Sequence, residues 1–371
     1  MILQIFLILT VLAVIAWVII RVFLVAPDYS RVDEPQHDLH HDLENVSAEN
    51  SDAMRFIDAM QDKLRAEPKH RRIVVLRKIF DEGFTGSPMQ AGQLGVDIEA
   101  VDVDGVDGEW VVAPGASPDR RLLYLHGGAF TIGSPRSHRM ITAALSKSCN
   151  VAVLAIDYRL MPEHRRKSAI ADCQNAYRWI LDNGPVGPNA ANEIFVTGDS
   201  AGGNLTLMLS AWARDANVRR MDAVIAFSPS TDSTLENPSM IKNIETDPML
   251  GPGLGPPARM PAPLKALAVL LASQMSPRNP LMSPLFGDLG NLPPTLVLAS
   301  DCEMLLDDSV RYVNKARSQG SPVTLQIWPG MAHVWPMFQH VLPEARQAID
   351  EVAAFIAANR ASAAINEASS G

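Results

Sequence analysis

The chain has 371 residues, 47% hydrophobic and 20% charged, a balance typical of a globular enzyme with one large core and an appended smaller unit. Its net charge is -9 and its basic clusters at 69–72 and 165–167 are short, so no nucleic-acid partner is expected. The three cysteines, Cys149, Cys173 and Cys302, are far apart and show no C-x-x-C spacing, so they suggest neither a disulfide framework nor a zinc site and do not identify a compartment.

The first 26 residues predict a membrane anchor. Residues 1–20 are almost wholly apolar, and a helix needs ~20 such residues to cross a bilayer. A cleaved signal peptide is the alternative, but its apolar region is only ~7–15 residues long, and Pro27 makes Ala26 a poor cleavage site. We therefore expect a single-pass anchor over 1–26. Arg21 and Arg31 follow the helix and favour a cytoplasmic domain, although the sequence leaves the side of the membrane open.

A polar, acidic linker is expected over 27–52, because this stretch lacks apolar periodicity. Helical spacing then appears over 50–65 and 71–82. One face of the first helix collects Met54, Ile57, Met60 and Leu64. We expect the segment 53–95 to form a helical cap that precedes the first strand.

From residue 96 onward, β-rich runs alternate with helical segments. The expected strands are 99–103, 109–113, 121–125, 151–157, 193–197, 223–227, 295–299 and 324–328. The expected helices are 137–148, 168–182, 201–213, 305–318 and 343–359. This alternation predicts an α/β fold with a mostly parallel eight-stranded sheet and helices on both faces. No helix separates the early strands, so the sheet is expected to begin antiparallel.

The catalytic domain is expected to span 96–361, followed by a disordered tail over 362–371. Within it, the Pro- and Gly-rich stretch 230–292 is too long for a simple connection and contains one convincing apolar helix near 264–275. We interpret this stretch as a cap-side insertion over the carboxyl ends of the strands, where an open α/β sheet places its site.

The strongest local motif is G-D-S-A-G at 198–202, with an expected strand before it and an expected helix after it. This context is that of the G-x-S-x-G nucleophile elbow of α/β-hydrolases. Small neighbours permit the tight turn that exposes the serine hydroxyl, and the helix N-terminus supplies backbone N–H groups beside it. Ser200 is therefore the candidate nucleophile, with an ordinary turn as the alternative interpretation.

A second motif, H-G-G-A-F at 126–130, directly follows the expected strand 121–125. Small residues there let the backbone approach a tetrahedral intermediate and stabilise its oxyanion. The candidate oxyanion-hole residues are Gly127, Gly128, Ala129 and Ala201. A Gly-rich turn without this role is the alternative, and it is disfavoured by the nucleophile elbow downstream.

The candidate base is His333, in the loop after the last expected strand. Such a loop lies at the carboxyl end of the strands, on the same rim as Ser200. The chain order of nucleophile, acid and histidine is also the order that α/β-hydrolases use.

Together these motifs resemble the hormone-sensitive-lipase-like esterases, whose signatures are H-G-G-G and G-D-S-A-G-G. Residues 157–164, D-Y-R-L-M-P-E-H, look like that family's Y-R-L-A-P-E-H segment. Residues 246–250 and 279–285 resemble its cap-side D-P-x-L and S-P-L elements, and 330–333 resembles its G-M-x-H. The resemblance covers about 122–356 and implies the α/β-hydrolase fold and activity on short to medium acyl esters.

Two departures from the family pattern concern the site. Ala129 replaces the third glycine of H-G-G-G, but an alanine keeps its N–H donor. The family's acid motif D-P-L is replaced by E-M-L at 303–305. Matching this segment to D-P-L-R-D-E implies Glu303 as the acid, with Asp301 as the runner-up.

The sequence thus predicts a carboxylesterase that needs neither a metal nor an organic cofactor. Its expected partners are a small-molecule ester and, through the N-terminal helix, a membrane; its oligomeric state is left open. An amidase or arylformamidase on the same residues is an alternative. So is a non-catalytic binder resembling the plant gibberellin receptors, but those lack the base that His333 provides here.

Overall fold

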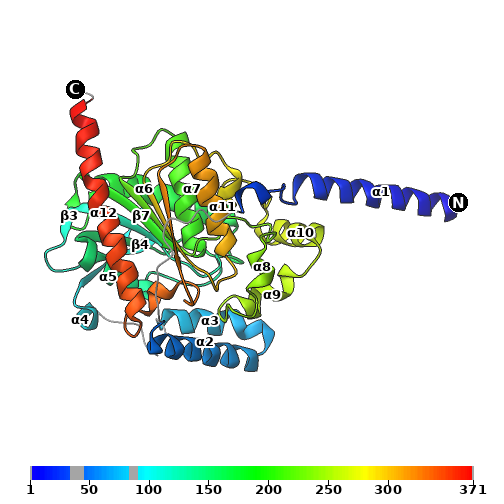
Figure 1. Cartoon of the computed structure of the whole chain (residues 1–371), viewed down its shortest axis with the longest axis horizontal. Helices are drawn as coiled ribbons and strands as arrows, with labels where there is room; N and C mark the ends of the chain where they lie inside the picture. Colours follow the sequence, from blue (N-terminus) through cyan, green and yellow to red (C-terminus); the bar gives the residue numbers. More distant parts are fainter. Residues whose placement is uncertain (1, 34–45, 83–90, 370–371) are drawn as a thin grey trace.

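The computed structural model describes residues 2–33, 46–82 and 91–369, and an eight-stranded sheet forms its centre (Figure 1). In spatial order the strands are β1 (Asp97–Asp102), β2 (Asp107–Val112), β4 (Val151–Ile156), β3 (Ser117–Leu125), β7 (Glu193–Asp199), β8 (Ala223–Phe227), β9 (Thr295–Ser300) and β10 (Val323–Trp328). The pairs β1–β2 and β2–β4 are antiparallel, and all later pairs are parallel. This arrangement confirms the mostly parallel sheet with an antiparallel start.

Helices cover both faces of the sheet because its inner strands are apolar on both sides. In β4 every residue is buried: Val151, Val153 and Ala155 pack into one layer, and Ala152, Leu154 and Ile156 into the other. The first layer is closed by α5 (Arg139–Cys149) and α12 (Pro343–Ser369). The second layer is closed by α6 (Arg166–Asp182), α7 (Ala201–Asp215) and α11 (Leu306–Ser318).

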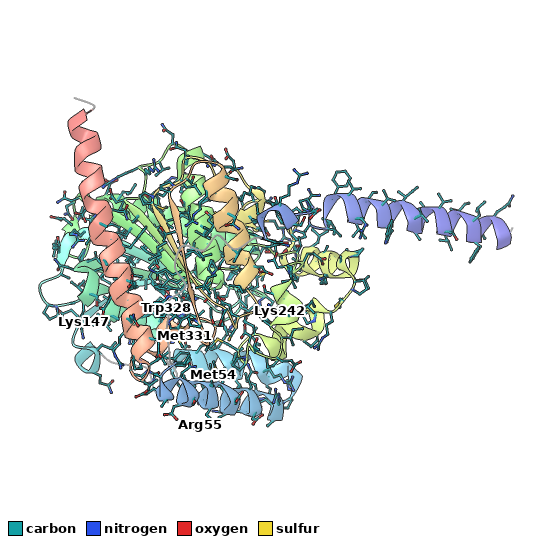
Figure 2. The ribbon with its side chains drawn as sticks, in the orientation of Figure 1. Met54, Arg55, Lys147, Lys242, Trp328 and Met331 are labelled. Carbon is teal, nitrogen blue, oxygen red and sulfur yellow. The ribbon has the colours of Figure 1, made fainter. Side chains whose placement is uncertain are left out.

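The segment expected to form an N-terminal cap contains α2 (Ala48–Ala66), α3 (Arg72–Asp81) and the short α4 (Ala91–Leu94). Figure 2 shows Met54 on the side of α2 that faces the body and Arg55 on the side that faces solvent. The helix starts at Ala48, earlier than expected, because Ser47 donates hydrogen bonds from its backbone N and its Oγ to the Glu344 carboxylate of α12, at 2.7 and 2.8 Å.

The insertion expected over 230–292 contains three α-helices, α8 (Ser239–Lys242), α9 (Gly251–Ala258) and α10 (Ala262–Ser273), followed by a short 3-10 helix at Pro284–Phe286. The apolar helix expected near 264–275 is α10. The expected linker is partly ordered, since the Asp33 carboxylate accepts hydrogen bonds from Arg311 of α11. Positions 34–45 of that linker lie outside the described residues.

The two ends of the chain form long helices. α1 (Ile2–Phe23) projects away from the body, and its segment Gln4–Phe23 is long and apolar enough to cross a membrane (Figure 1). α12 continues to Ser369, whereas the sequence analysis expected disorder from 362. The difference has a physical reason, because 361–364 reads A-S-A-A and alanine has the highest intrinsic helix propensity.

Candidate active site

Ser200 lies at the turn between β7 and α7, in a backbone conformation that side-chain-bearing residues seldom adopt. Its φ is 52° and its ψ is -113°. The backbone of this turn lies so close to the Leu125 carbonyl oxygen that a Cβ on Gly202 would be 1.8 Å from it. A Cβ on Gly198 would be 2.4 Å from the same atom. Both glycines of the motif are therefore required by close backbone approach, and the turn places the half-buried Ser200 at the carboxyl edge of the sheet.

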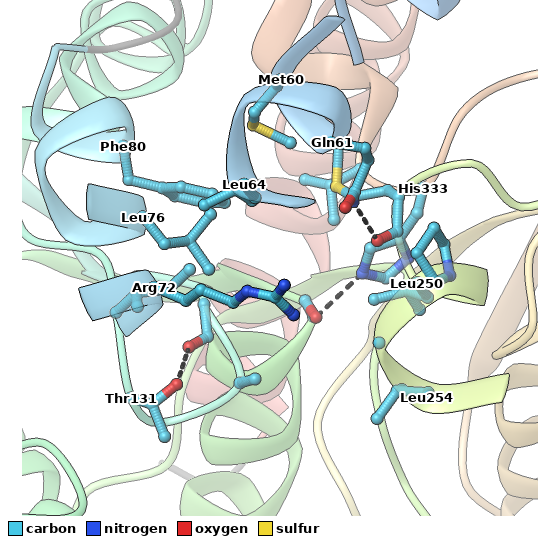
Figure 3. A pocket seen from close by; sticks show the side chains of 18 of the residues that line it. Met60, Gln61, Leu64, Arg72, Leu76, Phe80, Thr131, Leu250, Leu254 and His333 are labelled. Carbon is cyan, nitrogen blue, oxygen red and sulfur yellow. Dashed lines mark hydrogen bonds between the residues drawn. The ribbon is translucent and has the colours of Figure 1, made fainter. Parts of the chain in front are cut away.

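Two loops from neighbouring strands bring a histidine and a carboxylate to Ser200. His333 follows β10, and its Nε2 lies 2.9 Å from Ser200 Oγ (Figure 3). Glu303 follows β9, and its Oε2 lies 2.6 Å from His333 Nδ1. The carboxyl ends of parallel strands meet at one edge of the sheet, so residues distant in sequence converge there. The result is a hydrogen-bonded series from serine to imidazole to carboxylate.

Glu303 and Asp301 have different environments although they share one loop. Glu303 is fully buried, and its second oxygen accepts a hydrogen bond from the Ser300 backbone N at 2.9 Å. Asp301 is exposed and accepts a hydrogen bond from the Gly330 backbone N at 2.8 Å, which ties the two site loops together. The structure thus brings Glu303, and not Asp301, to His333.

The electrostatics around His333 favour its protonated form. Burial by itself lowers the pKa of His333, but the hydrogen bond and charge of Glu303, followed by the charge of Asp247, outweigh it and raise the pKa above the usual value. Asp247 comes from the cap-side insertion and accepts hydrogen bonds from the backbone N of Leu250 and of Met304, each at 2.9 Å. It therefore fastens the insertion to the loop that carries Glu303.

The H-G-G-A loop passes beside Ser200, and its backbone conformation explains its composition. Gly128 has a φ of 114° and Ala129 a φ of 52°, so an alanine tolerates the left-handed position that the family fills with glycine. Gly128 and Ala129 line a cavity together with Ser200. Ala201 is the first residue of α7, where backbone N–H groups have no intrahelical partner.

Gly127 does not fit its expected role as an oxyanion donor. Its backbone N–H donates to Asp199 Oδ1 at 2.9 Å, so that donor is already engaged. A Cβ at Gly127 would also lie 1.9 Å from Asp199 Oδ2. Gly127 therefore serves the close approach of the loop to Asp199, and the donors that remain at this site are those of Gly128, Ala129 and Ala201.

Asp199 is a site residue that the sequence analysis did not single out. It is buried beside Ser200, where its Oδ1 accepts a 2.7 Å hydrogen bond from the Tyr124 hydroxyl and lies 3.3 Å from His138 Nε2. Burial by itself raises the pKa of Asp199, but the His138 charge and the hydrogen bonds from His138 and Tyr124 outweigh burial. The net effect is a lowered pKa. Asp199 could have been predicted as a site residue from its place in the G-D-S-A-G motif. No local sequence pattern marks Tyr124 or His138 as its partners.

A cavity of about 590 Å³ opens from Ser200 and His333 toward the cap helices (Figure 3). Its wall is mainly apolar and comes largely from α2, α3, α9 and the residues just before α9; it includes Met60, Leu64, Leu76, Phe80, Leu250 and Leu254. Gln61 of α2 donates a 3.2 Å hydrogen bond to the Met249 carbonyl, which links α2 to the 230–292 stretch at the cavity wall. Arg65 and Arg72 add cationic groups at the same wall.

Comparison with known proteins identifies the family. A model of the alpha/beta hydrolase fold matches residues 122–337 of the chain. The chain belongs to this family. It is 37% identical over 244 residues to an acetyl-hydrolase of Streptomyces hygroscopicus, covering 65% of this chain and 77% of that protein. It is 34% identical over 236 residues to an esterase of Acinetobacter venetianus, covering 64% and 74% of the two chains.

Solved structures identify more specific relatives of this α/β-hydrolase. An esterase/lipase from an uncultured bacterium matches with a TM-score of 0.71 and 34% identity, over 85% of this chain and 99% of that one. An esterase from the bacterial hormone-sensitive lipase family matches with a TM-score of 0.71 and 31% identity, over 84% and 98%. The resemblance to hormone-sensitive-lipase-like esterases is therefore confirmed, and this α/β-hydrolase is an ester-hydrolysing enzyme.

No metal site is evident in the part of the chain that the structure describes. Within residues 2–33, 46–82 and 91–369, no three His, Cys, Asp or Glu side chains are grouped so as to hold a metal ion.

Proposed function

We propose that this enzyme hydrolyses carboxylic esters through an acyl-enzyme formed on Ser200. The supporting observation is the series of two hydrogen bonds from Ser200 Oγ to His333 and on to Glu303, at 2.9 and 2.6 Å. A serine hydroxyl becomes an effective nucleophile when a base within hydrogen-bond reach takes its proton and a third group orients that base. These three side chains meet that requirement: Ser200 and His333 line the cavity, and Glu303 is buried behind His333.

In the first half of the reaction, Ser200 Oγ attacks the acyl carbon while His333 Nε2 takes its proton. Glu303 holds the Nδ1–H and stabilises the imidazolium that forms. The oxyanion develops beside the backbone N–H groups of Gly128, Ala129 and Ala201, and each such donor is worth roughly 10²–10³ in rate in other enzymes. His333 then returns the proton to the oxygen of the leaving alcohol, and the carbon–oxygen ester bond breaks.

In the second half, water replaces the alcohol. His333 takes a proton from that water, the hydroxide oxygen attacks the acyl carbon, and Ser200 leaves with a proton returned by His333. The products are a carboxylic acid and an alcohol.

The proposed substrates are esters with short to medium acyl chains. The cavity volume of about 590 Å³ lies within the roughly 300–1,000 Å³ of sites for small ligands, and cap helices enclose its apolar wall. Relatives named acetyl-hydrolase and ethyl acetate hydrolase point the same way. A series of p-nitrophenyl esters of increasing acyl length tests this proposal, and preference for insoluble long-chain triglycerides contradicts it.

An amidase or arylformamidase would use the same residues, so an ester and an amide that carry the same acyl group distinguish the two activities.

A fluorophosphonate label tests whether Ser200 is the nucleophile. We expect the label on Ser200 in the wild-type chain and its loss in Ser200→Ala, while Ser318→Ala, at an exposed serine of α11, keeps both label and activity. Loss of a triad member typically costs ~10⁴–10⁶ in rate. Substantial turnover by folded Ser200→Ala contradicts the mechanism.

We further propose that α1 is an uncleaved membrane anchor. It has the length and composition of a spanning helix, and its side chains from Gln4 onward are exposed apart from the undescribed Ala16 and the half-buried Ile20. The full-length chain should therefore sediment with membranes and resist extraction at alkaline pH. Sequencing its N-terminus separates an anchor from a signal peptide, because a mature chain that begins near Pro27 would contradict the anchor.

A further inference from the structure

Helix α10 has the reverse of the polarity expected for a helix at a water-exposed surface. Its single charged residue, Lys265, is buried, and its Nζ lies 2.6 Å from Glu236 and donates to the backbone carbonyls of Leu235 and Ala258. Surface helices of soluble proteins bury their apolar face and expose their polar one. Here the polar interactions are directed inward.

The outward face of α10 is wholly apolar. Its exposed residues are Leu264, Ala268, Leu271 and Ala272, at the spacing of one helical stripe. Leu264 is 52% exposed and Leu271 is 69% exposed. One exposed leucine needs no explanation, but a continuous apolar stripe on a helix whose lysine is turned inward indicates an apolar surrounding.

The neighbour of α10 indicates which surrounding this is. α10 packs beside the base of α1, on the side of the body from which α1 projects (Figure 1). Arg278, just after α10, donates a hydrogen bond to the backbone carbonyl of Val22 near the end of α1. The stripe therefore lies on a helix that contacts the proposed anchor, and it stays exposed with α1 in place.

We infer that the outer face of α10 lies against the same lipid bilayer that α1 enters. This inference rests on the proposed anchoring by α1. An interfacial helix buries its apolar face ~5–10 Å into the boundary between headgroups and acyl chains. The insertion is thereby held at the lipid surface, and α9, which immediately precedes α10, lines the cavity at Pro252 and Leu254.

The test uses the full-length chain in phosphatidylcholine vesicles with brominated acyl chains. A polarity-sensitive thiol dye is attached at Leu271→Cys in a Cys302→Ser background, because the other two cysteines, Cys149 and Cys173, are buried. Val186→Cys is the matched control, since Val186 is 77% exposed and lies in the turn between β5 (Asn183–Gly184) and β6 (Gly187–Pro188). We expect bromolipid to quench the label at 271 about twofold more than the label at 186, as burial at the acyl boundary implies.

Each outcome has one interpretation, and the esterase activity of both labelled proteins on a soluble ester verifies their fold. A chain that fails to float with the vesicles overturns the anchor and this inference together. A chain that floats, but whose label at Leu271 is quenched no more than the one at Val186, leaves the anchor standing and overturns only the role of α10. A blue-shifted label without lipid quenching, together with cross-linking of the unlabelled Leu271→Cys protein through its free thiol, indicates a second copy of the chain on this face and also overturns the inference.

Discussion

Replacing Glu303 by glutamine is the sharpest test of the proposed triad, because the substitution keeps the shape of the side chain and removes its charge. Glu303 is fully buried, and its two oxygens are engaged by His333 Nδ1 at 2.6 Å and the Ser300 backbone N at 2.9 Å. A glutamine that keeps its carbonyl oxygen on Ser300 directs its NH₂ toward His333. The imidazole is then driven to the tautomer whose Nε2 carries the proton and cannot accept one from Ser200.

The expected loss follows from both effects. The equivalent change in a known serine hydrolase triad lowers kcat about 10⁴-fold, and without the carboxylate the imidazolium in the transition state is left unpaired. We expect a fall of about 10³–10⁴ in kcat, or roughly 4–5.5 kcal/mol of transition-state stabilisation. KM should change little, because Glu303 does not line the cavity.

The assay compares kcat of Glu303→Gln and Asp301→Asn on one soluble p-nitrophenyl ester, with circular dichroism to verify folding. Asp301 is exposed, and its carboxylate accepts a hydrogen bond from the Gly330 backbone N but does not reach His333. The kcat of Asp301→Asn should therefore stay within about tenfold of the wild-type value. Near wild-type activity in Glu303→Gln together with a loss of several orders of magnitude in Asp301→Asn would refute the reasoning.

Three further outcomes are expected. Asp199→Asn removes the charge that holds Tyr124 and the oxyanion loop, so kcat on a soluble ester should fall about 10- to 10²-fold, less than for loss of an oxyanion donor itself, and unchanged kcat contradicts this positioning role. Because only neutral His333 accepts a proton and its pKa is raised, the fall of kcat/KM at low pH should begin at a higher pH than an ordinary histidine would give. Glu303→Gln should move this acidic limb to lower pH, and an unmoved limb opposes the assignment. Gly202→Ala places a Cβ 1.8 Å from a backbone oxygen, so we expect a Tm below wild type and no measurable activity; an unchanged Tm contradicts the close approach.

Much of the fold and part of the site follow from local sequence. The alternation of β-rich and helical segments predicted the eight-stranded sheet, because a strand buried on both faces requires an apolar run that few other elements show. The G-D-S-A-G motif predicted the turn at Ser200, since Gly198 and Gly202 occupy positions that no side chain fits. His333 was found through its place after the last strand. In each case neighbouring residues in the chain carry the signal.

Contacts between distant segments were decided only by the tertiary structure. Glu303 and Asp301 lie two residues apart, and the resemblance to a family motif favoured Glu303, but which carboxylate reaches His333 depends on how the loops after β9 and β10 pack. In the same way, the N–H of Gly127 is engaged because β7 places Asp199 beneath the loop. Composition had offered no reason to separate Gly127 from Gly128.

Helix α10 is a second case in which the tertiary structure decided what the sequence left open. Its sequence predicted an apolar helix, and an apolar helix in a globular protein is ordinarily buried. Only the fold revealed that Lys265 points inward, to Glu236 and two backbone carbonyls, while Leu264 and Leu271 remain exposed beside α1. The physical reason is general to this chain: periodicity fixes which residues share a face of an element, whereas the direction of that face depends on which distant segments pack against it.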